Sequence, residues 1–305
     1  MRVRAAHALA RRRRASIASS VQPELRAQFD RDGFIVIRDL LPSDQFEQLT
    51  RSVVDLTLEC REQLQGDTIT CRVPIGPELL RQVPLLAELV EDDRWKAAMA
   101  YVASTRSEPL YYLQAIAGGV VAGPPDPQLE LHADTFHPSM KAWLFLTDVG
   151  EDDRPLTYVA GSHRLTAERA VWERDRSTAV LTDGDRLSQR GSLRIAVEEL
   201  ADLALPQPTR FCVPANTLVI ADTSGFHARA DSSRPTLRIE LWAYCRRSPF
   251  LPWTRGDLLS ARPFAKHRAG WALKLVDWLE ARGWMKQHWR PAGPWRDSRA
   301  LSLRR

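Results

Sequence analysis

A histidine and an aspartate lie two positions apart, as His132 and Asp134, in the stretch LELHADTFHP. Successive side chains of a β-strand point to opposite faces, so side chains two positions apart point the same way. In extended backbone these two groups can therefore contact one metal ion from one side. A third ligand has to come from elsewhere in the chain.

His227 is the best-placed third ligand. Of the six histidines besides His132, one lies near the N-terminus and two lie near the C-terminus, which leaves three candidates, His137, His163 and His227. His227 follows the strand-like run NTLVIAD and a Thr-Ser-Gly turn, 93 residues after Asp134. A rolled sheet can bring these two segments together at one end.

Two imidazoles and one carboxylate on one face of an ion are the ligand set of non-haem iron(II) oxygenases, and they leave three positions open. A structural zinc site is closed by four protein ligands, more often including cysteine. The predicted site therefore favours iron(II) over structural zinc.

An open iron site commonly takes its electrons from a 2-oxo acid, whose far carboxylate needs a cation. Arg238 lies eleven residues after His227 on the next predicted strand, where its planar fork can bind a carboxylate through two hydrogen bonds. Arg234 is a competitor, but it lies in a Ser-Ser-Arg-Pro turn, where we expect solvent as its partner. Glu240 is two positions beyond Arg238 on the same strand face and can pair with it instead.

The chain that positions these residues has 305 residues, 44% of them hydrophobic, which suffices for one large domain with extensions or for two small ones. Its 43 lysines and arginines exceed the 38 aspartates and glutamates only slightly. Four cysteines lie far apart without a C-x-x-C pair, which argues against a zinc knuckle, a redox pair or a disulfide framework. No window is apolar enough to span a bilayer, and we expect a cytoplasmic protein.

The composition divides the chain into three regions. Residues 1–26 are rich in Arg, Ala and Ser, and we expect a frayed basic arm rather than a targeting segment. Residues 27–250 form the core domain, with a polar, charged insertion at 163–210. We expect residues 251–305 to form a helical extension, which is rich in Trp and Arg. That extension contains six of the ten tryptophans, namely Trp253, Trp271, Trp278, Trp284, Trp289 and Trp295.

Periodicity places the elements within these regions. A β-branched strand at 34–37 precedes helical patterns at about 43–56 and 84–103. From about 109 the pattern changes to short strands, namely PLYYLQAIA, KAWLFLTDV, NTLVIAD and TLRIELWAY. The coarse picture is a β-rich core preceded by helices.

The stretch HRAGWALKLVDWLEARG in the extension reads as an amphipathic helix that ends at Gly283. Its apolar face would consist of Trp271, Leu275, Trp278 and Leu279. We expect this face to pack on the outside of the core, because apolar helix stripes are usually buried.

Four stretches together resemble the phytanoyl-CoA dioxygenase family, a branch of the iron(II)- and 2-oxoglutarate-dependent dioxygenases. They are FDRDGFIVIRDLLPSDQFEQL, LHADTFH, LTYVAGSHRL and FHARADSSRPTLR, and they span about residues 27 to 244. The resemblance implies a mainly β fold with flanking helices, the double-stranded β-helix (a cupin-like jelly roll). It also implies that His132, Asp134 and His227 bind iron and that Arg238 anchors the C5 carboxylate of 2-oxoglutarate.

The implied activity uses Fe(II), 2-oxoglutarate and O2 to hydroxylate an unactivated C–H bond, with release of succinate and CO2. The sequence departs from the family pattern at Ala160, where a proline usually precedes Gly-Ser-His. The basic residue often found on the strand before the H-x-D motif is also missing, and Gln114 is the nearest polar substitute to contact the co-substrate. Asp134 disfavours halogenation, because halogenating relatives have a small residue there.

Several alternatives stay open at this stage. His163 is expected to be structural or at the rim of the site, and His137 to lie either beside the ligands or on the surface. The same iron site can support desaturation, epimerisation or ring closure, and the fold can also serve a metabolite-binding protein without catalysis. We expect a small or lipid-like metabolite as substrate and no nucleic acid partner. Peripheral membrane contact through the tails and the oligomeric state are open.

Overall fold

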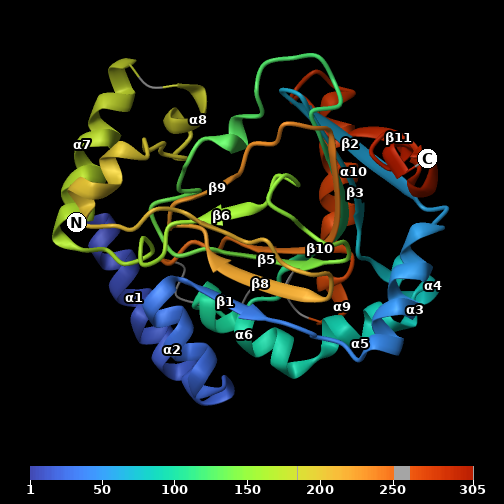
Figure 1. The fold of residues 1–305 in the computed structure, drawn as a ribbon, viewed down its shortest axis with the longest axis horizontal. Helices are drawn as coiled ribbons and strands as arrows, with labels where there is room; N and C mark the ends of the chain where they lie inside the picture. The colour runs from blue at the N-terminus through green and yellow to red at the C-terminus, as the bar shows by residue number, and fades with distance from the viewer. Residues whose placement is uncertain (184, 251–261, 305) are drawn as a thin grey trace.

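The computed structural model of the protein describes residues 1–183, 185–250 and 262–304. Two antiparallel sheets dominate it, one of eight strands and one of three (Figure 1). The large sheet has the order β1 (Phe34–Ile37), β8 (Thr217–Asp222), β5 (Met140–Phe145), β10 (Thr236–Cys245), β4 (Leu110–Gly118), β3 (Thr68–Pro74), β2 (Glu59–Gln65), β11 (Arg290–Pro294). The small sheet has the order β7 (Thr209–Arg210), β6 (Leu156–Tyr158), β9 (His227–Arg229).

The two-residue period of the strands sorts their side chains between two cores. On β5, Ala142 and Leu144 face the helices, whereas Trp143 and Phe145 face the small sheet. Tyr158 of β6 packs in the same inter-sheet core as Trp143 and Phe145. The fold is therefore the mainly β double-stranded β-helix with flanking helices that the resemblance implies.

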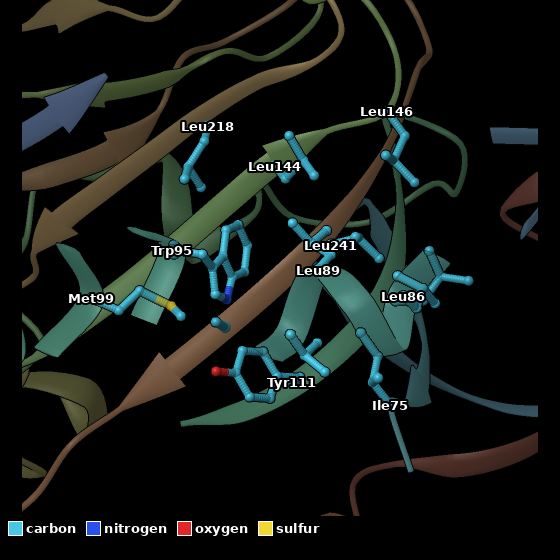
Figure 2. Packing of buried hydrophobic residues seen from close by; sticks show 14 of the residues in the cluster. Ile75, Leu86, Leu89, Trp95, Met99, Tyr111, Leu144, Leu146, Leu218 and Leu241 are labelled. Carbon is cyan, nitrogen blue, oxygen red and sulfur yellow. The ribbon is translucent and has the colours of Figure 1, made fainter. Parts of the chain in front are cut away.

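Helices cover the outer face of the large sheet. Figure 2 shows Leu86, Leu89 and Trp95 packing against Leu144 and Leu241 of the sheet. The helices before the site are α1 (Arg2–Ile17), α2 (Pro23–Asp32), α3 (Ser43–Val54), α4 (Pro77–Gln82), α5 (Pro84–Glu91) and α6 (Asp93–Ala103). This helical layer covers one face of the large sheet. A cavity for a ligand can therefore form only on the other face, which is turned toward the small sheet.

The segment predicted as an insertion forms two helices, α7 (Ala167–Asp183) and α8 (Arg186–Gln189), which follow β6 in the chain. Trp172 of α7 packs edge-on against Phe226 with ring centroids 5.0 Å apart. Phe226 belongs to a third core behind the small sheet. This helical segment therefore supports the small sheet from its outer side.

The hairpin of β2 and β3 is an element that the periodicity did not predict. Its strands pair in register from Gln65↔Thr68 outward, so only Gly66 and Asp67 form the loop. Gly66 has a φ of +57°, which favours glycine. The Gly-Asp pair between two alternating runs is the signal that could have revealed this hairpin.

The expectation of a frayed N-terminal arm is wrong. Residues 2–17 form helix α1, and its side chains of Ala6, His7, Ala10 and Ile17 are buried. The two tails lie at opposite ends of the molecule in Figure 1. Helix α1 is therefore part of the folded domain.

The expectation for the C-terminal helix is also wrong. Helix α10 spans Arg268–Glu280 and follows the short α9 (Arg262–Ala265), but Trp271, Leu275 and Trp278 are exposed. A periodic apolar stripe predicts which residues share a face and not whether another element covers that face. Trp253, counted above in the extension, lies outside the described residues. Among the described residues, no helix has both the length and the apolar character to span a membrane.

Candidate metal centre

The structure brings His132, Asp134 and His227 together. One potential ligand atom from each residue lies within 4.8 Å of the others. The Nε2 atom of His132 is 3.8 Å from Asp134 Oδ1, and the Nε2 atom of His227 is 3.7 Å from Asp134 Oδ2. The three groups therefore surround one point, as the spacing argument requires, while their role as metal ligands stays a prediction.

Backbone hydrogen bonds between two distant segments create this proximity. His132 and His227 exchange a pair of N–H to carbonyl hydrogen bonds, each 3.0 Å long. The Asp134 N–H donates to the Thr223 carbonyl at 2.8 Å. The H-x-D segment thus continues the small sheet beside β9, which places all three side chains at one edge.

Hydrogen bonds at Nδ1 prepare both imidazoles for metal binding. Nδ1 of His132 is 2.8 Å from the Glu130 carbonyl, and Nδ1 of His227 is 3.0 Å from the Gly225 carbonyl. A carbonyl can only accept, so each Nδ1 carries the proton and each Nε2 presents its lone pair. Among the residues that the structure describes, the buried Nε2 of His227 has no hydrogen-bond partner, which leaves it available to a metal ion.

The charge states also suit a metal ion. Burial lowers the pKa of His132 well below its ordinary value and lowers the pKa of His227 to about 4, so both rings are neutral at pH 7. Burial alone would raise the pKa of Asp134, but nearby positive charge, led by Lys141, outweighs it and lowers this pKa. Neutral imidazoles and an ionised carboxylate are the forms that bind metals.

Lys141 is a site residue that the sequence reading missed. Its Nζ lies 2.7 Å from Asp134 Oδ2, so the ion pair holds the carboxylate in place. Lys141 precedes Trp143 and Phe145 by steps of two on β5, and these residues face the inter-sheet core. The alternation in KAWLF could have placed this lysine inside.

A cavity of about 270 Å³ adjoins the three residues. Five cationic side chains line it, namely Arg72, Lys141, Arg229, Arg238 and Arg246. Three of them are already paired with carboxylates, because Lys141 binds Asp134, Arg229 binds Asp126 at 2.5 Å and Arg238 binds Glu240 at 2.7 Å. Cations exceed carboxylates, so the cavity suits an acidic ligand.

Arg238 lies at the cavity in a buried polar network. Its Nε donates to Glu240, and its Nη1 donates to the Arg154 carbonyl at 2.7 Å. The ion pair with Glu240, left open above, therefore forms. Gln114 donates from Nε2 to the same carboxylate and accepts from Nε of Arg72 at 2.7 Å, so it also reaches the cavity wall.

Arg72 is a second residue that the sequence reading missed, because the hairpin carrying it was not predicted. Its guanidinium carbon lies 4.1 Å from the ring centre of Trp242 and 4.4 Å from that of Trp289. Burial lowers its pKa to about 10, so the side chain stays charged at pH 7. The rings hold this cation in a fixed orientation at the cavity.

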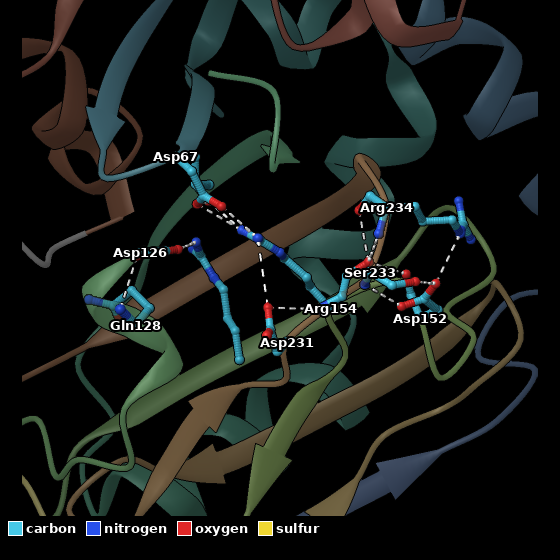
Figure 3. Close-up of polar contacts among 11 residues, drawn as sticks. Asp67, Asp126, Gln128, Asp152, Arg154, Asp231, Ser233 and Arg234 are labelled. Carbon is cyan, nitrogen blue, oxygen red and sulfur yellow. Dashed lines mark hydrogen bonds and ion pairs between the residues drawn. The ribbon is translucent and has the colours of Figure 1, made fainter. Parts of the chain in front are cut away.

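Arg234, the competing anchor, is placed elsewhere. It is exposed on the surface, as expected, and it also pairs there with Asp153 at 2.5 Å. Figure 3 shows Arg234 beside Ser233 and Asp152, away from the pair formed by Arg154 and Asp67. That second pair anchors the loop whose carbonyl receives Arg238.

The two remaining candidate histidines do not join the cluster. His163 is buried against Phe29, with ring centroids 5.1 Å apart, and it is not at the rim of the cavity. His137 is buried and its Nδ1 lies 2.9 Å from the Pro138 carbonyl, so the surface alternative is wrong. Both rings are buried among other parts of the fold, which indicates a structural role.

The family described as Phytanoyl-CoA dioxygenase (PhyH) matches residues 29–197, more than half of the chain. No curated protein matches the sequence.

Among solved structures, the chain is similar to the non-haem alpha-ketoglutarate-dependent epimerase SnoN from nogalamycin biosynthesis. That pair has 18% identity and a TM-score of 0.49, and it covers 80% of this chain and 91% of that chain. HygX from Streptomyces hygroscopicus, solved with nickel and 2-oxoglutarate, has 18% identity and a TM-score of 0.47, with 74% and 87% covered. The carbocyclase SnoK from nogalamycin biosynthesis has 16% identity and a TM-score of 0.44, with 74% and 84% covered.

Proposed function

Because this chain belongs to the phytanoyl-CoA dioxygenase family, we propose that it is an Fe(II)- and 2-oxoglutarate-dependent dioxygenase. It hydroxylates an unactivated C–H bond of a small or lipid-like metabolite and releases succinate and CO2. The observation that carries the proposal is the buried cluster of His132, Asp134 and His227, whose ligand atoms surround one point beside a cavity.

The donor set of this cluster fits iron(II). Two neutral imidazole nitrogens and one carboxylate oxygen come from one side, and the orphaned Nε2 of His227 needs a partner in its buried position. His132, Asp134 and His227 would hold the metal, and the carbonyls of Glu130 and Gly225 orient the two rings. Lys141 keeps the carboxylate ionised and directed toward the same point.

The cavity wall supplies the remaining roles. Arg238 would bind the C5 carboxylate of 2-oxoglutarate through a charge-assisted hydrogen bond. Gln114 holds the Glu240 carboxylate that orients Arg238. With O2, bound iron and 2-oxoglutarate supply an oxidant strong enough to attack a C–H bond. The aromatic side chains of Trp143 and Trp242 also line this cavity.

The test combines binding and turnover. Purified protein receives Fe(II) and 2-oxoglutarate without oxygen, and a 2-oxoglutarate-dependent absorption band in the visible range is expected. With oxygen and a pool of metabolites, succinate and a product with one additional oxygen are expected by mass spectrometry. Loss of two hydrogens or an isomer of unchanged mass would instead assign desaturation, ring closure or epimerisation.

Variants connect the result to the proposed ligands. His132→Ala and Asp134→Ala are expected to lose the absorption band and the succinate, whereas His288→Ala, which removes an exposed histidine, is expected to retain both. Full turnover in the first two variants would refute the ligand assignment. Binding of a metabolite without any succinate would favour a non-catalytic binding protein.

A further inference from the structure

Helix α1 lies outside the residues that match the family, yet one of its side chains enters the core beside the metal centre. Nη2 of Arg14 lies 2.8 Å from Oδ2 of Asp222, and the two side chains are only 12% and 0% exposed. The guanidinium also donates to the carbonyls of Tyr101 and Val102 at 3.1 and 2.8 Å. Its position is therefore fixed from two sides.

The other oxygen of Asp222 joins two segments that carry ligands. Oδ1 accepts hydrogen bonds from the Ser139 N–H at 3.1 Å, the Ser224 N–H at 3.0 Å and the Ser224 hydroxyl at 2.7 Å. Ser139 ends the loop that starts at Asp134, and Ser224 belongs to the turn that leads into His227. One buried carboxylate thus connects both segments.

The turn after Asp222 contacts the ligands directly. The Thr223 carbonyl accepts from the Asp134 N–H at 2.8 Å, and the Gly225 carbonyl contacts Nδ1 of His227 at 3.0 Å. The position of this turn therefore decides where the carboxylate and the imidazole point. Asp222 holds the turn, and the ion pair that the structure gives Asp222 is with Arg14.

Electrostatics makes Arg14 necessary for this arrangement. Burial would raise the pKa of Asp222, but the positive charge of Arg14 leads the effects that outweigh burial and lower this pKa. A fully buried carboxylate without its cation is costly and tends to take up a proton or water. Either change weakens the bonds at Oδ1 that hold the two segments.

Another residue of helix α1 contacts the loop that follows Asp134. The guanidinium carbon of Arg2 lies 4.2 Å from the centre of the Phe136 ring. This contact does not involve Asp222. The helix therefore contacts the segments of the metal site through residues near both of its ends.

We propose that Arg14 is a positioning residue of the metal centre, acting through Asp222 on the segments that carry Asp134 and His227. The N-terminal helix lies outside the residues that match the family, but through Arg14 it then helps to position the ligands of the site. This inference rests on the metal site of the proposed function.

The test measures metal affinity in the full chain. Titration with Mn²⁺, with free ion counted by electron paramagnetic resonance, gives the dissociation constant without any turnover. Arg14→Gln is expected to weaken Mn²⁺ binding by about tenfold or more, the size of effect that residues supporting metal ligands produce. Arg14→Lys, which keeps the positive charge, is expected to recover a substantial part of the affinity.

Two matched controls separate positioning from general stability. Arg61→Gln breaks the ion pair between Arg61 of β2 and Asp277 of α10, whose side chains are 18% and 38% exposed, and neither residue lines the cavity. It is expected to lower the melting temperature but to leave Mn²⁺ affinity within about twofold of the parent. Arg11→Gln removes an exposed arginine from the same helix and is expected to change neither quantity.

The outcomes distinguish the two proposals. A parent protein that binds no Mn²⁺ overturns the proposed function and this inference with it. A parent that binds, together with a folded Arg14→Gln variant of equal affinity, overturns this inference alone, as does an equal loss in Arg61→Gln. If Arg14→Gln does not fold, Ser224→Ala removes only one bond to Asp222, and unchanged affinity in that variant overturns the inference.

Discussion

Replacing Glu240 by glutamine tests the charge balance of the cavity wall. Glu240 is fully buried and is the carboxylate of a network with two guanidinium groups, because it accepts from Arg238 directly and from Arg72 through Gln114. Glutamine has nearly the same shape, so Glu240→Gln removes the charge and leaves the packing intact. In this variant the buried guanidinium groups of Arg238 and Arg72 no longer have the Glu240 carboxylate to balance their charge.

The magnitude follows from burial. The side chains of Arg238 and Glu240 are 5% and 0% exposed, so solvent does not screen the pair. Breaking one partner of such a buried pair costs about 3–5 kcal/mol. At about 2–4 °C per kcal/mol for a domain of this size, the melting temperature is expected to fall by roughly 10 °C.

2-Oxoglutarate is expected to reverse part of this loss. Its C5 carboxylate supplies the negative charge that Arg238 lacks in Glu240→Gln, so the ligand should stabilise the variant more than the parent. Circular dichroism melts with Mn²⁺, with and without 2-oxoglutarate, measure both effects. The control is Glu280→Gln, which removes the charge from an ion pair with Arg290. The Arg290 and Glu280 side chains are 54% and 29% exposed, so we expect a much smaller fall in melting temperature there.

Two results would contradict this reasoning. A melting temperature for Glu240→Gln equal to that of the Glu280→Gln control would mean that the network does not depend on the charge. An equal 2-oxoglutarate shift in variant and parent would mean that Arg238 does not bind the C5 carboxylate.

Two further predictions concern acid stability and the turn before His227. Burial lowers the pKa values of His7 and His163 from 6.5 to about 4. Between about pH 6.5 and pH 4 the unfolded chain therefore binds protons at these histidines that the folded chain does not bind. The free energy of unfolding should therefore fall as pH decreases from about 6.5 to about 4, and denaturant titrations showing no change would refute this. In Gly225→Ala the added methyl group would overlap the Tyr158 hydroxyl and displace the turn, so Mn²⁺ affinity should drop at least tenfold. Titration calorimetry measures this affinity, and a value equal to that of the parent protein would contradict the prediction.

The sequence by itself determined the features that depend only on residues close to one another in the chain. Two-residue spacing was enough to place His132 and Asp134 on one side, and the aromatic and aliphatic run KAWLFLTDV predicted the strand that carries Trp143. The position of His227 after the strand-like run NTLVIAD favoured this histidine as the third member of the cluster. These predictions succeeded in locating the cluster because neighbouring side chains and strand period are fixed by covalent geometry.

Only the tertiary structure decided which distant groups meet. Arg14 and Asp222 are 208 positions apart, and nothing in either neighbourhood identifies the other as a partner. Likewise, the stripe on α10 is periodic but exposed, and Arg238 lies beside both Glu240 and the cavity. Periodicity tells which side of an element a residue occupies, whereas the packing of whole elements decides what covers that side and which charges balance there.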